Sequence, residues 1–239
     1  MKNIAIIQAS AKSASMPGKI LKNLLDKTVL EHTVLRVQAC ANIEAVFVAA
    51  TINREDLSVA ELCARNGVGI FCGSETDILD RFYQLAKLIR PQNIVKINAD
   101  CPLCGADTID RVLSLHVKEG TAYACGPQNA PQGAEAEVFT FAALKKAWEN
   151  TPEGGRTVTA YMRQYPLLFP QAALPPYEED FSQKQWALKT QHDYSFLRAI
   201  YQNLYPKNPL FSQKDVLELV RQQPHLERIN RPEPEVVAA

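Results

Sequence analysis

The 239-residue sequence predicts an α/β protein built on a mostly parallel sheet. Over the first half of the chain, short apolar runs typical of buried strands alternate with stretches that have helical spacing. Segments that alternate in this way form crossover units, in which a helix connects two parallel strands. The composition is that of a globular protein with a packed core, because 46% of the residues are hydrophobic and 22% are charged.

Five strands and four helices are expected in the first half of the chain. The expected strands cover residues 2–8, 44–50, 68–73, 93–99 and 121–126. The expected helices cover residues 28–40, 54–67, 76–89 and 106–120. Thr28 and Glu31 have the spacing of a capping box at the start of the first helix, and Gly67 and Gly120 are typical helix ends.

The second half of the chain has a less regular pattern. We expect strands at 135–141 and 185–190, and helices at 142–150, 157–165, 192–205 and 212–223. Residues 169–183 are polar and rich in proline, which is typical of a surface segment. We interpret residues 1–230 as one domain and residues 231–239 as a disordered tail.

Charge and hydropathy exclude several classes of protein. The 26 Lys and Arg residues equal the 26 Asp and Glu residues, so the chain has no broad basic surface for nucleic acid. No apolar run approaches the roughly 20 residues that span a bilayer, and the first apolar run is too short for a signal peptide. A cytoplasmic protein is therefore expected. Its six cysteines are interpreted as small buried hydrophobic residues rather than disulfide partners.

Ligands of such sheets bind outside the carboxyl ends of the strands, which directs attention to the loops 8–19, 72–77 and 99–105. The first of these, QASAKSASMPGK, can present backbone N–H groups to a phosphate, and Lys19 would add a positive charge. Its spacing matches neither a P-loop nor the dinucleotide-binding pattern. Taken alone, that spacing favours an ordinary solvated loop.

The loop 99–105 offers a carboxylate and two thiols. Asp100 follows the fourth strand, where a carboxylate together with substrate phosphates suits Mg²⁺, although a turn aspartate is commoner. Cys101 and Cys104 form a single CxxC pair, which is weak evidence for zinc or for redox chemistry. Two buried thiols are the favoured interpretation.

Two further segments contain candidate site residues. Ser74 or Thr76 can cap the helix 76–89, and Arg81 can reach a ligand at the sheet edge or form a local ion pair. Glu135 and Glu137 have the same parity on an expected strand, so they face one side. Such a pair either binds a cation or faces solvent.

Several blocks in the expected order resemble one known family. IIQASAKSASMPGKILKNL, FCGSETDILDRFYQLA, NADCPL and QGAEAEVFTFAALKKAW are similar to the spore-coat-polysaccharide type of sugar cytidylyltransferase, over roughly residues 3–230. That family is related to the synthetases that activate keto-deoxy-octulosonate and sialic acids with CTP. The resemblance implies the GT-A-like, Rossmann-like fold of nucleotide-diphospho-sugar transferases, with a mixed, mainly parallel sheet, helices on both faces, and a homodimer.

The resemblance also implies roles for individual residues. Lys19 and Asp100 would be catalytic, and Asp100 and Glu137 would hold Mg²⁺. The acceptor, a sugar acid or a similar small molecule, would contact Glu135, Glu137 and Lys189. The triphosphate of CTP would contact Gln8, Ala9, Ser10, Lys12, Ser13, Lys19, Gly73, Ser74 and Arg81.

The sequence departs from the family pattern where phosphates and metal are bound. Ser10 and Ser15 replace two arginines, Lys12 replaces a glycine, and Lys189 replaces an aspartate. A serine gives one neutral hydrogen bond where an arginine gives two charge-assisted ones, so each loss would cost about 1.5–3 kcal/mol of phosphate binding. The Lys189 ammonium is expected to take the place of a cation near Asp100 or Glu137.

Three functions remain open from the sequence. The first is an active cytidylyltransferase that transfers CMP from CTP to a sugar acid or related acceptor in surface-polysaccharide biosynthesis. The second is an inactive relative that binds a nucleotide, a sugar or a protein partner. The third is a glycosyltransferase, for which only the carboxylates of EAE at 135–137 suggest a metal-binding pair.

Overall fold

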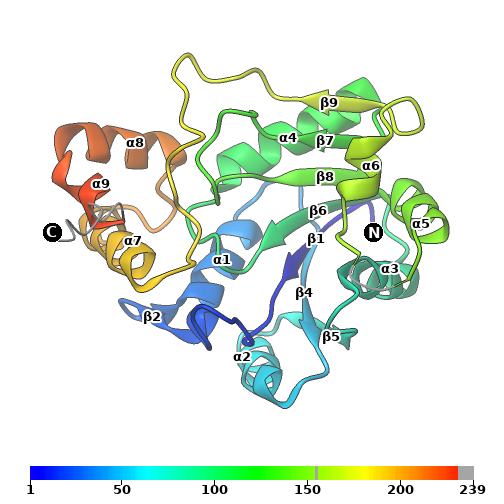
Figure 1. The fold of residues 1–239 in the computed structure, drawn as a ribbon, viewed down its shortest axis with the longest axis horizontal. Coiled ribbons are helices and arrows are strands. Elements are labelled where there is room, and N and C mark those ends of the chain that lie inside the picture. The colour runs from blue at the N-terminus through cyan, green and yellow to red at the C-terminus, as the bar shows by residue number, and fades with distance from the viewer. Residues whose placement is uncertain (154–155, 231–239) are drawn as a thin grey trace, which may run out of the picture.

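The computed structural model describes residues 1–153 and 156–230, so the expected tail at 231–239 lies outside the described residues. A seven-stranded sheet runs through the centre of the molecule (Figure 1). In spatial order its strands are β5 (Gly69–Gly73), β4 (Ala45–Thr51), β1 (Asn3–Gln8), β6 (Asn93–Asn98), β8 (Glu137–Thr140), β7 (Tyr123–Cys125) and β9 (Gln171–Ala173). Only β8 runs antiparallel to its neighbours. The expected mixed, mainly parallel sheet is confirmed.

Helices cover both faces of this sheet, as expected (Figure 1). Successive residues of a strand point to opposite faces, so Ile7 packs with α1 (Val29–Gln38), α2 (Leu57–Arg65) and α4 (Ala106–Glu119), whereas Ile6 packs with α3 (Ile78–Ile89) and α5 (Phe141–Asn150). The other helices are α6 (Ala160–Gln164), α7 (Gln191–Leu204), α8 (Gln213–Gln222) and α9 (His225–Ile229), with 3₁₀ turns η1 (Lys19–Leu21) and η2 (Arg54–Asp56). A small hairpin joins β2 (Asn23–Leu24) to β3 (Lys27–Thr28).

Local signals set most helix ends. The Thr28 side chain accepts from the Glu31 N–H and the Glu31 side chain accepts from the Thr28 N–H, so the expected capping box is present. Gly67 and Gly120 have φ angles of +63° and +62°, which glycine adopts without strain. No helix in the described ranges is long and apolar enough to cross a membrane.

Two segments of the second half differ from expectation. Residues 171–173 form β9, which pairs with β7 inside the segment expected to be irregular. Residues 185–190 form no strand. They lie beside the loops at the sheet edge through a bridge from Gln185 to Gln132 and a hydrogen bond from the Leu188 N–H to the Asp100 carbonyl oxygen. Their apolar side chains, Trp186 and Leu188, instead pack against α7 and α8, and this burial explains a pattern that imitates a strand.

Candidate functional site

A cavity of about 370 Å³, here called the loop pocket, opens beyond the carboxyl ends of β1 and β6. The parallel register places Gln8 beside Asn98 at that edge, so the loops that follow the two strands face each other. Most of the sequence-predicted residues of the nucleotide site line this cavity, namely Gln8, Ala9, Ser10, Lys12, Ser13, Lys19, Arg81 and Asp100. Glu75, Ile78 and Asn98 complete much of the wall.

The buried carboxylate of Asp56 anchors the 8–19 loop to the body of the protein. Asp56 is 1% exposed, and its Oδ1 accepts a hydrogen bond from the Ala11 N–H at 2.5 Å. Its Oδ2 accepts from the backbone N–H of Thr51 at 2.9 Å and from the Thr51 hydroxyl at 2.5 Å. Gly18, at φ +69°, closes the loop by donating to the Ala11 carbonyl. Sequence reasoning missed Asp56, because an acid at the start of a helix is a common capping residue.

Lys19 brings a positive charge into the loop pocket. Its ammonium lies 2.5 Å from Asp100 Oδ2 and 2.8 Å from the Leu188 carbonyl oxygen. Both charged side chains are mostly shielded from solvent, which strengthens their attraction relative to a surface pair. The two predicted catalytic residues are therefore brought together.

A second ion pair lies at the solvent-facing side of the same pocket. The Lys12 ammonium is 2.6 Å from Glu75 Oε1, and the hydrogen bond that it donates to this carboxylate raises the pKa of Lys12. Glu75 was not predicted, since nothing in the 72–77 segment distinguishes it from an ordinary loop acid. The two serines of the pocket stabilise turns within the loop. Ser10 Oγ accepts a hydrogen bond from the Lys12 N–H, and Ser13 Oγ accepts one from the Met16 N–H.

Arg81 is buried, and its guanidinium donates to the carbonyl oxygens of Ala9, Ala49, Ser74 and Glu75 at 3.0–3.4 Å. It therefore joins the ends of β1 and β4 to the 72–77 loop rather than projecting free charge toward a ligand.

Gly73 and Ser74, which were predicted to contact the triphosphate, do not line the loop pocket. A Cβ added to Gly73 would lie 3.1 Å from Arg81 Cγ and 2.9 Å from Phe71 Cε1, so this glycine allows Arg81 to approach. Ser74 Oγ accepts a hydrogen bond from the Asp77 N–H at the start of α3. Both residues support the wall of the pocket through Arg81 and α3.

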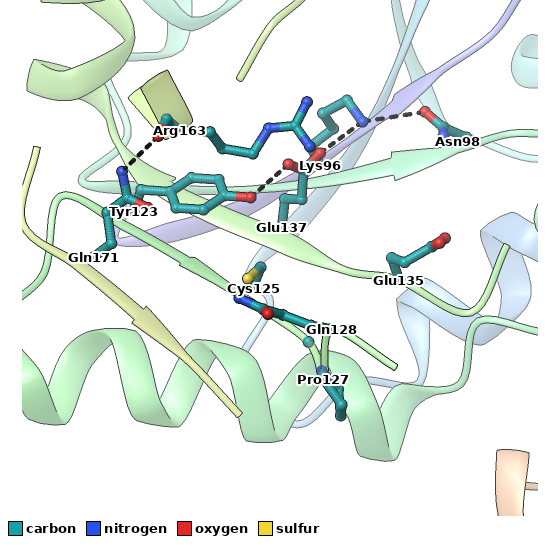
Figure 2. Close-up of a pocket in the computed structure, with 11 residues that line it drawn as sticks. Lys96, Asn98, Tyr123, Cys125, Pro127, Gln128, Glu135, Glu137, Arg163 and Gln171 are labelled. Atoms are coloured by element: carbon teal, nitrogen blue, oxygen red, sulfur yellow. Dashed lines mark hydrogen bonds and ion pairs between the residues drawn. The ribbon is translucent and has the colours of Figure 1, made fainter. Parts of the chain in front are cut away.

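A larger cavity of about 640 Å³, here called the sheet pocket, lies over the β6–β8–β7 part of the sheet (Figure 2). Its lining residues are Lys96, Asn98, Tyr123, Cys125, Gly126, Pro127, Gln128, Glu135, Glu137, Arg163 and Gln171. Asn98 lines both cavities, so the two pockets meet at the end of β6.

Glu137 is fixed at the centre of the sheet pocket. It lies opposite Lys96 in the antiparallel register, and the Lys96 ammonium is 2.9 Å from its Oε2. Tyr123 and Thr159 donate hydroxyl hydrogen bonds to its Oε1 at 2.7 and 2.8 Å. Burial acts to raise the pKa of Glu137, but the Lys96 charge and these hydrogen bonds outweigh it and lower the pKa.

Glu135 does not share a strand face with Glu137, so that prediction is wrong. β8 begins only at Glu137, and Glu135 accepts a hydrogen bond from the Gly133 N–H in the preceding turn. Gly133 has φ +94° and lies against Ala187, which keeps the chain out of the strand at this point. Both carboxylates still line the sheet pocket, at separate points of its wall (Figure 2). The EAE motif thus provides no paired carboxylates of the kind a glycosyltransferase would use.

Arg163 is a cation of the sheet pocket that sequence reasoning missed. It lies in the last turn of the short helix α6, and its side chain extends along the pocket wall in Figure 2. Among the residues that the structure describes, its guanidinium has no hydrogen-bond or ion-pair partner. Gln171 donates to the carbonyl oxygens of Met162 and Arg163, which fixes the backbone of this turn.

The expected role of the Lys189 ammonium is wrong. This side chain is exposed, donates to Gln132 Oε1 at 3.3 Å and lines neither pocket. The cations beside Asp100 and Glu137 are instead Lys19 and Lys96. The reason is that residues 185–190 cross the end of the sheet without joining it, which leaves the Lys189 side chain outside the pockets.

The donor atoms present determine how a metal fits. The described ranges contain no group of three or more His, Cys, Asp or Glu side chains that could hold one. Asp100 lines the loop pocket and Glu137 the sheet pocket, and both oxygens of Glu137 already accept hydrogen bonds, from Lys96, Tyr123 and Thr159. Mg²⁺ commonly takes one carboxylate together with phosphate oxygens and water, so Asp100 fits it and Glu137 does not.

The two cysteines beside Asp100 are free and buried, as expected. Burial raises the pKa of both the Cys101 and the Cys104 thiol. This is the state of an inert packing residue, since it is the thiolate that reacts or binds metal.

Comparisons with known proteins agree with this geometry. A family model described as cytidylyltransferase matches residues 4–228. The chain is 39% identical over 180 residues, 74% of each chain, to an uncharacterized protein of Methanocaldococcus jannaschii. It is 29% identical over 228 residues to the spore coat polysaccharide biosynthesis protein SpsF of Bacillus subtilis, covering 92% of this chain and 94% of that one.

The solved structures include a cytidylyltransferase from Leptospira borgpetersenii with a TM-score of 0.89 and 25% identity, where the match covers 98% of both chains. The sheet order and the helices on its two faces are thus those of a known nucleotidyltransferase. Because the family model covers nearly the whole chain and the predicted loop residues line one cavity, this protein belongs to the cytidylyltransferase family.

Proposed function

We propose that this protein transfers CMP from CTP to a hydroxyl group of a sugar acid or a related acceptor, in the synthesis of a surface polysaccharide. The loop pocket would hold the triphosphate and the sheet pocket the acceptor. The observation that carries the proposal is the meeting of the two pockets at Asn98, because an attacking hydroxyl must lie beside the α-phosphate.

In this reaction the acceptor oxygen forms a bond to the α-phosphorus of CTP, and the bond to the leaving pyrophosphate breaks. Such transfers depend on positioning and charge neutralisation more than on a covalent intermediate. The Lys19 ammonium would stabilise negative charge on the phosphates, and the Asp56-anchored loop would keep its backbone around them. Mg²⁺ held by Asp100 would neutralise part of the phosphate charge.

The chemistry of the sheet pocket supports an acidic acceptor. Among the described residues, none is paired with the Arg163 guanidinium in this pocket, and a guanidinium can bind a carboxylate through two parallel hydrogen bonds. The carboxylate of Glu137 is held by Lys96, so it does not compete for Arg163 in the described structure. Gln128 and Asn98 offer neutral groups to sugar hydroxyls.

Calorimetric titration with CTP, with and without Mg²⁺, tests the nucleotide part of the proposal. ATP, GTP and UTP are the controls, and CTP is expected to bind more tightly than any of them when Mg²⁺ is present. Pyrophosphate release in a panel of sugar acids and matched neutral sugars then tests the transfer. Release with neutral sugars alone would contradict an acidic acceptor.

A second candidate, a relative that binds nucleotide without transferring it, is favoured by one observation. Both lysines of the loop pocket are paired with carboxylates, and Arg81 donates to backbone carbonyls. The phosphate site therefore has less free positive charge than two arginines at positions 10 and 15 would give. CTP binding without pyrophosphate release from any acceptor of the panel would support this candidate.

A further inference from the structure

We propose that Glu75 makes the loop pocket select metal-bound CTP over metal-free CTP. It does so by holding Lys12 and by placing a negative charge where the triphosphate enters. This inference rests on the proposed function, since it assigns a specificity-determining residue to the same nucleotide pocket.

The first support is position. Lys12 comes from the loop after β1 and Glu75 from the loop after β5, and both line the loop pocket. Their side chains meet at 2.6 Å and are 59% and 39% exposed, which places this ion pair at the solvent side of the pocket. Arg81 donates to the Glu75 carbonyl and so ties the backbone of Glu75 to the pocket wall.

The second support is the charge inventory of the pocket. Its charged lining residues are Lys12, Lys19, Arg81, Glu75 and Asp100. Each lysine is paired with one of the two carboxylates. A metal-free triphosphate therefore meets two negative side chains, and it gains a lysine only by separating that lysine from its carboxylate.

Mg²⁺ would reduce the repulsion between the phosphates and a carboxylate by different amounts for Asp100 and for Glu75. Asp100 lies deeper, beside Lys19, where it would hold the metal ion, and the charge of that ion would offset the repulsion between Asp100 and the phosphates. Glu75 lies at the rim and has Lys12 as its ion-pair partner. When Lys12 turns toward a phosphate, Glu75 faces the anion, and its repulsion is greatest when no metal reduces the phosphate charge.

The variant Glu75→Gln removes the charge and keeps the shape of the side chain. Its affinity for CTP is expected to rise about five- to tenfold in EDTA and by less than about twofold with Mg²⁺, because one unscreened charge a few ångströms from a triphosphate has an effect of this size. Glu61→Gln, an exposed acid on α2 outside the pocket, is the matched control and should change neither affinity.

Repeating the Glu75→Gln substitution in Lys12→Gln protein separates two effects of Glu75, which are its repulsion of the triphosphate and its competition with the triphosphate for Lys12. In Lys12→Gln protein, Glu75→Gln should give a smaller gain in EDTA, because there is no lysine to release. An equal gain in both backgrounds would overturn the part of the inference that involves Lys12.

Tripolyphosphate is the second probe, because it reports the charge of the pocket without any recognition of the base. An unchanged affinity of Glu75→Gln for metal-free CTP and for metal-free tripolyphosphate would overturn the inference. Failure of wild-type protein to bind CTP with Mg²⁺ would instead refute the proposed function. In that case the tripolyphosphate titrations still decide whether Glu75 excludes metal-free polyphosphate.

Discussion

Replacing Asp56 with asparagine is expected to release the 8–19 loop from the body of the protein. The carboxylate has one oxygen on the Ala11 N–H and the other on the backbone N–H and hydroxyl of Thr51. An asparagine has a single carbonyl oxygen, so its NH₂ group must face one of these N–H donors. The variant thus keeps the size of the side chain but places two donors against each other at a buried site.

The size of the effect follows from these bonds. A hydrogen bond to a charged group contributes about 1.5–3 kcal/mol, and a buried donor without a partner costs about 1–3 kcal/mol. Because the asparagine retains one side of the interaction, the free energy of unfolding is expected to fall by about 2–4 kcal/mol. The loop is also expected to hold the triphosphate less well, so the affinity for CTP should decrease.

Urea denaturation gives the stability, and calorimetric titration of the folded variant with CTP and Mg²⁺ gives the affinity. Glu61→Gln, which changes the charge by the same amount on the surface of α2, controls for net charge. An Asp56→Asn protein with stability within about 0.5 kcal/mol of wild type would refute the argument, because that is the range of a neutral surface change.

Three further changes test other parts of the structure. His116 is buried between Thr121 and Asn93, and burial lowers its pKa to about 4, so between pH 6.5 and 4 only the unfolded state takes up the proton. Stability to urea should therefore fall by up to roughly 3 kcal/mol over that range, and His116→Gln should lose most of this slope. Arg163→Met should raise the KM for a sugar acid at least about tenfold while the affinity for CTP stays unchanged, since one charge-assisted contact is removed; an unchanged KM would place the acidic group of the acceptor elsewhere. Ser10→Arg should increase the affinity for CTP by about tenfold if phosphates lie at the loop pocket, and equal affinities by calorimetry would argue against that placement.

The sequence predicted the sheet well because its signals are local. Buried strands and amphipathic helices alternate up to β7, the start of α1 coincides with its capping box, and the end of α4 coincides with Gly120. Residues 185–190 misled the same reasoning, since Trp186 and Leu188 are buried by α7 and α8 rather than by a neighbouring strand. Periodicity reports which side chains are buried but not which element buries them.

The sequence predicted those site residues that the strand topology alone brings together. Parallel strands β1 and β6 end at one edge, and so Lys19 meets Asp100 across 81 positions of sequence. Asp56, Glu75 and Arg163 could not be found in this way. Each is a charged residue in a loop or at a helix end. Asp56 and Glu75 act through partners from distant segments, Ala11 and Lys12, and Arg163 matters only because folding places it in the lining of the sheet pocket.

The backbone contacts of residues 188 and 189 change how sequence divergence at the site should be judged. Leu188 offers its carbonyl oxygen to Lys19, and Lys189 offers its own to the Ser15 hydroxyl. Every amino acid has a carbonyl, so substitutions at these two positions can leave both contacts intact. A score based on side-chain identity therefore overstates the difference that Lys189 makes to this wall of the site. Homologues with unlike residues here can share the same geometry around the lysine.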